Sequence, residues 1–142
     1  MKKTWKDLLA ERRVEKLSVD KAEIAELWSL ARRNLSDASA HGLSPEGKFE
    51  FAYNAARTLA TIAIRTKGYR VKSTAGHHWN TFLALEVAMG PSMTEIAAYF
   101  DQCRQKRNNA LYDTADAITE TEAHELLDKA PSRFSFADAS WL

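Results

Sequence analysis

The sequence predicts an all-α protein, an up-down bundle of four to five helices. Apolar residues recur at helical spacing through most of the 142 residues, and no segment longer than GYRVKS, at 68–73, shows strand alternation. The chain has only five glycines and three prolines, and they cluster where the helical patterns stop. With 45% hydrophobic and 27% charged residues, a chain of this length can bury one core.

We divide the chain into an N-terminal helical extension, 1–18, a helical bundle, 19–130, and a C-terminal tail, 131–142. The extension is expected to hold one short helix from about Thr4 to Lys16. The tail carries large aromatic residues without helical spacing, which need cover from the bundle or from a second copy of the chain. These aromatic residues are Phe134, Phe136 and Trp141.

Two long helices should open the bundle. The first begins near Asp20, whose carboxylate can accept from the amides of a first turn, and it should stop before Gly42. Ser44 followed by Pro45 marks the next start, and this second helix should run to about Lys67. Its many alanines predict close approach of a neighbouring helix. Its apolar stripe is Phe49, Ala52, Tyr53, Ala56, Leu59, Ala60 and Ala63.

Three signals define the second half of the bundle. A helix is expected over 77–89, because Gly90 followed by a proline closes the pattern. The next helix should span about 93–115. A last helix should start at Thr119, since Thr119 and Glu122 have the spacing of a capping box.

Composition and charge limit the classes of function. Lys and Arg number 20 against 19 Asp and Glu, so no global charge favours nucleic acid or an anionic membrane. No apolar run approaches the ~18 residues of a membrane span, and the first residues lack the apolar core of a secretory signal. We therefore expect a cytoplasmic protein. Cys103 is the only cysteine, so we expect a buried thiol, no internal disulfide, no metal and no cofactor.

Two neighbouring helices each carry a charged residue on an apolar face. Arg107 falls in the middle of the apolar face of the helix over 93–115, and Glu86 projects from that of the preceding helix. Because an isolated buried charge is too costly to persist, we predict that Glu86 and Arg107 form a structural pair. Alternatively, each side chain reaches solvent along its own stem. The apolar face assigned to the helix of Glu86 is Trp79, Phe82, Leu83 and Met89, with Asn80 and Thr81 opposite.

Further polar residues flank Arg107 on the same helix. Arg104, Asn108 and Tyr112 are four residues apart and therefore line up along one edge. Two guanidiniums, an amide and a phenol can grip a phosphate through forked hydrogen bonds, so Arg104 and Arg107 are candidate substrate-binding residues. The same set would also suit a solvated helix edge.

Three segments, CRQKRNNALYD, SPEGKFEFAYNAARTLATIAIR and GHHWNTFLALEVAMG, resemble the small bacterial members of the HEPN superfamily. The resemblance covers about residues 20–129. It implies a bundle of four or five helices, frequently a homodimer in which two motif helices face each other. Many members are, or derive from, metal-independent endoribonucleases of toxin–antitoxin, abortive-infection and other defence systems. Others have lost catalysis and act as binding or scaffold modules.

The HEPN motif is an Arg, often followed by Asn, and then a His after four to six residues on one late helix. Arg107 and Asn108 match it, but Tyr112 stands where the His is expected. A His with a pKa of about 6.5 suits proton transfer to and from RNA, whereas a Tyr with a pKa of about 10 seldom accepts a proton. His77 and His78 are candidates to replace the missing His, or they cap and pack a helix start.

Three functions remain open on this basis. In an endoribonuclease, the two arginines and Asn108 would bind the phosphate, while Tyr112 and a histidine would transfer protons. In a non-catalytic HEPN module, the same pocket would bind a nucleotide or RNA end, or hold a dimer that docks a partner such as a nucleotidyltransferase-type antitoxin. In a structural protein, Arg107 and Glu86 would form an ion-pair network. We favour a dimeric HEPN-type protein that binds RNA or nucleotide phosphate, with endoribonuclease activity left open.

Overall fold

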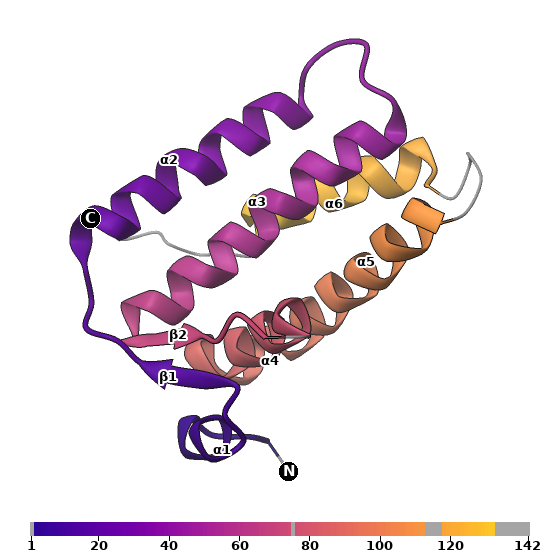
Figure 1. Cartoon of the computed structure of the whole chain (residues 1–142). Coiled ribbons are helices and arrows are strands. Elements are labelled where there is room, and N and C mark those ends of the chain that lie inside the picture. The colour runs from indigo at the N-terminus through magenta and orange to yellow at the C-terminus, as the bar shows by residue number, and fades with distance from the viewer. Residues whose placement is uncertain (1, 75, 113–117, 133–142) are drawn as a thin grey trace.

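The computed structural model describes residues 2–74, 76–112 and 118–132, without the side chains of 110–112. Within these residues the chain is an all-α helical bundle with one short pair of strands at its end (Figure 1), so the predicted fold class is confirmed. None of the described helices combines the length and the apolar character needed to cross a lipid bilayer. The tail beyond Ser132, with its aromatic residues, lies outside the described part.

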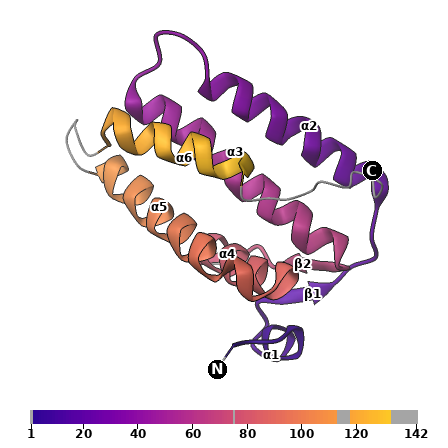
Figure 2. The same cartoon turned by 180° about the vertical axis from the view of Figure 1, so that it is seen from behind.

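Helix α3 is the centre of the bundle, with α2 on one side and α4 and α5 on the other (Figures 1 and 2). It also packs against α6. The alanines of its buried face allow this close approach, as the sequence predicted. The helix bounds are α2, Lys21–Ala38; α3, Pro45–Thr66; α4, His77–Met89; α5, Thr94–Tyr112; and α6, Glu120–Ser132.

Local capping signals determine where these helices begin. Asp20 Oδ1 accepts from the amide of Ala22 at 3.0 Å, and Ser44 Oγ accepts from the amide of Gly47 at the same distance. The box predicted at Thr119 is present, because its hydroxyl accepts from the amide of Glu122 at 3.1 Å and its own amide donates to the Glu122 carboxylate at 2.9 Å. These predicted helix starts are confirmed.

The helix predicted from Thr4 to Lys16 is wrong in its second half. Helix α1 spans only Trp5–Ala10, and Arg12, with φ of 58°, takes a left-handed conformation that stops it. The chain then forms β1, Val14–Lys16, which pairs antiparallel with β2, Tyr69–Val71. The strand places Val14, 2% exposed, in the core. Burial and pairing with a distant segment therefore override local helical spacing.

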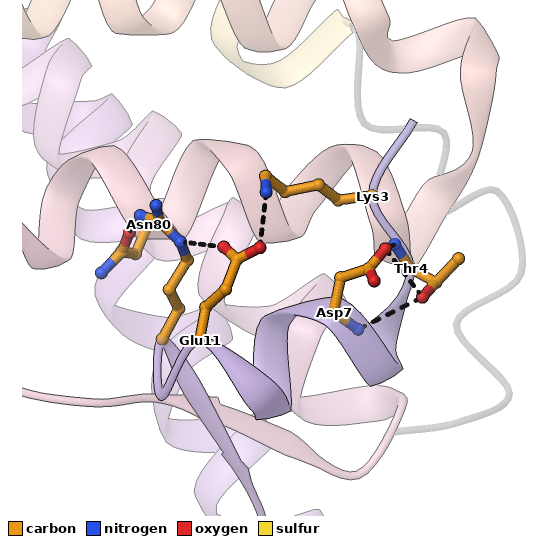
Figure 3. A network of polar contacts seen from close by, with 6 residues as sticks. Lys3, Thr4, Asp7, Glu11 and Asn80 are labelled. Carbon is orange, nitrogen blue, oxygen red and sulfur yellow. Dashed lines mark hydrogen bonds and ion pairs between the residues drawn. The ribbon is translucent and has the colours of Figure 1, made fainter. Parts of the chain in front are cut away.

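Polar contacts fasten the N-terminal segment to α4 (Figure 3). Lys3 Nζ and Arg13 Nε each donate to the Glu11 carboxylate at 2.6 Å. Arg13 Nη1 also donates to Oδ1 of Asn80 at 2.6 Å. This last bond matters most for packing, because it satisfies a buried amide on α4 from a residue outside the bundle.

The apolar face predicted for α4 is wrong. Asn80 and Thr81 are buried, whereas Trp79 is 42% exposed. The two polar side chains can be buried because both are satisfied: Asn80 accepts from Arg13, and the Thr81 hydroxyl donates to the carbonyl of His77 at 2.8 Å. Apolar residues lie on most sides of this helix, so its spacing did not distinguish one face from another.

A buried arginine joins the end of α3 to the segment between β1 and α2. Arg65 is 2% exposed, and its Nε donates to Glu23 at 2.7 Å. Its Nη1 donates to the carbonyls of Leu17 and Tyr69 at 3.0 and 3.1 Å, and its Nη2 donates to that of Ser18 at 2.6 Å. A guanidinium with this many acceptors holds three chain segments together. The sequence analysis missed it.

Candidate functional site

Arg107 of α5 points its guanidinium toward α3. Its Nε and Nη2 donate to the two carboxylate oxygens of Glu50 at 2.7 and 2.9 Å, a two-bond fork. Its guanidinium carbon lies 5.2 Å from the centre of the Tyr53 ring, within cation–π range. The side chain is 23% exposed, and its hydrogen bond with Glu50 raises the pKa of Arg107. A permanently charged group is thus held in one orientation at the edge of the core.

The predicted pairing of Arg107 with Glu86 is wrong. Glu50 is the partner of Arg107, and Glu86 accepts from the hydroxyl of Thr94 at 3.0 Å. The cause is the orientation of α4, which buries Asn80 against its neighbours and turns Glu86 into an outer groove beside Trp79. Glu50 directly follows Phe49, the first residue of the predicted apolar stripe of α3. Its carboxylate lies within reach of Arg107 on α5.

Tyr53 continues the site from Arg107 to the start of α4. Its ring is fully buried, and its hydroxyl lies 3.0 Å from Nδ1 of His78. Burial raises the pKa of Tyr53 to about 12, so the phenol stays protonated and donates to that nitrogen. Burial, reinforced by the charges of Arg57, His77 and Arg107, lowers the pKa of His78 to about 4. His78 is therefore neutral at pH 7, and its own proton is on Nε2.

Arg104 lies one turn before Arg107 on α5. Its Nε donates to Oδ1 of Asp101 at 2.6 Å, and Gln105 donates to the other oxygen of that buried carboxylate at 3.0 Å. Asp101 thereby orients Arg104. The charge of Arg104 also contributes to the low pKa of His78, which shows that the two groups share one electrostatic environment. Asn108 lies half-buried on the same helix.

The structure brings only part of the predicted site together. Arg104, Arg107 and His78 share one region. His77 is exposed, with Nδ1 3.2 Å from the carbonyl of Thr74, and its ring meets that of His78 edge-on at 4.4 Å. Tyr112 is the last residue of α5, and its side chain lies outside the described residues.

Three residues of α3 were missed as members of this site: Glu50, Tyr53 and Arg57. Their spacing of three and four residues places them on one side of the helix, facing α4 and α5. The sequence analysis assigned Tyr53 to the core alone. A tyrosine flanked at helical spacing by a carboxylate and a guanidinium was the available signal.

Compared with models of known protein families, with curated proteins and with solved structures, the chain gives no match. Among the described residues, no group of three or more His, Cys, Asp and Glu side chains is placed to hold a metal ion. The fold and the site thus define a helical-bundle protein with oriented arginines beside a Tyr–His hydrogen bond.

Proposed function

We propose that the chain is a HEPN-type protein that acts as a homodimer and binds a phosphate group of RNA or of a nucleotide at Arg104 and Arg107. The orientation of Arg107, forked on Glu50 and packed on Tyr53, carries this proposal. A guanidinium fixed in advance loses little side-chain freedom when a phosphate binds. The match of Arg107 and Asn108 to the HEPN motif supports the same residues.

Donors remain for a ligand after these internal bonds are counted. Among the described residues, Nη1 of Arg107 and both Nη atoms of Arg104 have no acceptor. The guanidiniums of Arg57, Arg104 and Arg107 stand against two carboxylates, Glu50 and Asp101, which leaves one net positive charge. A second subunit facing this helix would double that charge without changing the net charge of each chain.

The state of His78 favours binding over proton transfer. Its Nδ1 is engaged by Tyr53, and its Nε2 carries a proton, so the imidazole donates a hydrogen bond rather than accepting a proton. An endoribonuclease would need that Tyr53–His78 bond to break in the substrate complex. We therefore place binding first and metal-independent cleavage of toxin–antitoxin or defence type second.

One observation favours a catalytically inactive scaffold that docks a partner protein, such as a nucleotidyltransferase-type antitoxin. Both Arg104 and Arg107 already have a carboxylate partner, at 2.6 and 2.7 Å. In a scaffold these bonds would hold α5 in place, and a phosphate would gain nothing from them. Loss of either arginine would then change stability alone.

The test compares wild type with Arg107→Ala and with Arg33→Ala, an exposed arginine of α2 that serves as the matched control. Binding of a short fluorescent single-stranded RNA is measured by anisotropy with a chelator present, and the same mixtures are examined for cleavage. We expect Arg107→Ala to weaken binding at least tenfold and to reduce the salt slope by about 1. The control should match wild type.

Other results would favour one of the alternative functions or contradict the proposed dimer. Cleavage by wild type that disappears in Arg107→Ala would favour the endoribonuclease. Equal RNA affinity in the two variants, with a lower midpoint of unfolding for Arg107→Ala alone, would favour the scaffold and refute phosphate binding here. Sedimentation of wild type as a monomer at micromolar concentration would contradict the proposed dimer.

A further inference from the structure

A basic cavity lies between α3, β2 and the first turns of α4. Its volume is ≈ 150 Å³. The five heavy atoms of a phosphate group would fit such a space. Arg107 does not line this cavity.

The ionisable side chains that line the cavity are all basic. The described residues around it include three arginines and a histidine but no carboxylate. Two of the arginines are already neutralised from outside: Arg65 by Glu23 at 2.7 Å, and Arg70 by Glu15. The third, Arg57, has no such partner among the described residues.

Arg57 has a hydrogen-bonding need that the described protein leaves unmet. Its side chain is half-buried, and its Nε is buried with no acceptor among the described residues. Leaving a buried N–H without an acceptor is costly, and a charged one costs more. The hydroxyls of Thr61 and Thr81 each donate to a carbonyl of their own helix, and neither accepts a hydrogen bond from Nε of Arg57. An anion bound in the cavity would give the guanidinium of Arg57 the partner that it lacks among the described residues.

His77, at the first turn of α4, also lines the cavity. This helix of 13 residues starts after Gly76, which provides no side-chain cap, so its N-terminal partial positive charge is not offset there. The Nδ1 of His77 lies 3.2 Å from the carbonyl of Thr74. When Nδ1 donates to that carbonyl and the ring is protonated, the Nε2–H is left to donate to an anion.

We propose that this cavity binds a phosphate-class oxyanion, either free or at the end of a larger molecule. The guanidinium of Arg57, which has no carboxylate partner among the described residues, is the central donor, and His77 with the first turn of α4 completes the site. Arg57 also adds charge to the region of Arg104 and Arg107, but neither of those two arginines lines this cavity, so the proposal goes beyond the function given above.

The test titrates inorganic phosphate into the full chain, with chloride at matched ionic strength as the reference. The thermal midpoint and the arginine Nε–H signals in NMR are followed. Phosphate should raise the midpoint of wild type and shift one Nε–H signal, which Arg57→Gln identifies by its loss. Affinity should fall at least tenfold in Arg57→Gln and stay unchanged in Arg33→Gln.

Arg107→Ala separates the two proposals, because it should lose RNA binding yet keep its response to phosphate. If Arg57→Gln does not fold, the wild-type Nε–H shift and His77→Ala, with weakened phosphate affinity, still decide. A 5′-phosphorylated trinucleotide that displaces phosphate, where its 5′-hydroxyl form does not, identifies a chain end as ligand, and no displacement identifies the free ion. A response to phosphate equal to that of chloride, or unchanged in Arg57→Gln, overturns the proposal.

Discussion

Replacing Arg65 by Met tests how much one buried guanidinium contributes to the fold. Met fills a similar volume but provides no donor, so the carboxylate of Glu23 and three backbone carbonyls lose their partner together. Removing one member of a buried ion pair costs about 3–5 kcal/mol. Glu23 is 39% exposed and Leu17 36%, so water can reach some of the freed acceptors. We therefore expect the lower end, about 3 kcal/mol.

Urea unfolding followed by circular dichroism measures this loss. With an m-value of about 2 kcal/mol/M, the midpoint should fall by about 1.5 M and m should not change. Arg33→Met, on the exposed side of α2, is the matched control and should stay within about 0.5 kcal/mol of wild type. Glu23→Gln should cost only about 1 kcal/mol, because the Gln amide oxygen can still accept from Arg65, which also keeps its three backbone acceptors.

Two outcomes of the urea unfolding of Arg65→Met would contradict the expected role of Arg65. If Arg65→Met loses less than about 1 kcal/mol, the four hydrogen bonds are replaced by water without net cost, and the proposed role of Arg65 in joining three segments is wrong. A lower m-value would instead show that the segment before α2 detaches in the folded state.

Three further predictions concern single residues. Burial lowers the pKa of His78 to about 4, so the folded state binds fewer protons than the unfolded state between about pH 6.5 and 4. Stability should fall across that window as the pH drops, by about 1–2 kcal/mol after allowance for solvent screening, and His78→Gln should lack this part of the acid loss; equal pH slopes in the two proteins would contradict it. Burial raises the pKa of Cys103 to about 12, so a thiol reagent at pH 8 should label the folded chain at least about a hundredfold more slowly than the chain in urea. Gly68 has φ of +84° with space for a methyl group, so Gly68→Ala should cost about 1 kcal/mol in urea unfolding, and an unchanged midpoint would refute the backbone argument.

Local signals in the sequence were sufficient for most of the fold. Asp20, Ser44 and Thr119 cap helices where predicted, because a cap depends on residues no more than three positions away. The strand at Val14 was missed because its partner, Val71, lies far along the chain. Short strands stabilised by distant partners leave little local pattern.

The site was predicted less completely than the fold, for a related reason. Arg107 was recognised as a charge on an apolar face, but its partner depended on the rotation of α4 and on which neighbour α5 meets. In that rotation Asn80 is buried and accepts a hydrogen bond from Arg13, a residue far away in the sequence that no helical period connects to it. Tyr53 has the spacing of a core residue and is one, so its hydrogen bond to His78 could not be inferred from period alone.

The pairing of β1 with β2 has a consequence for the order in which the molecule assembles. Helices α2 and α3 follow one another across a short connection and can associate early, whereas β1 must wait for a strand synthesised much later. Closing so long a loop adds only slowly to the entropic cost, so the delay affects kinetics more than final stability. We expect hydrogen exchange to find the N-terminal amides opening independently of the bundle. The segment that precedes the bundle in the chain is then the last to dock on it.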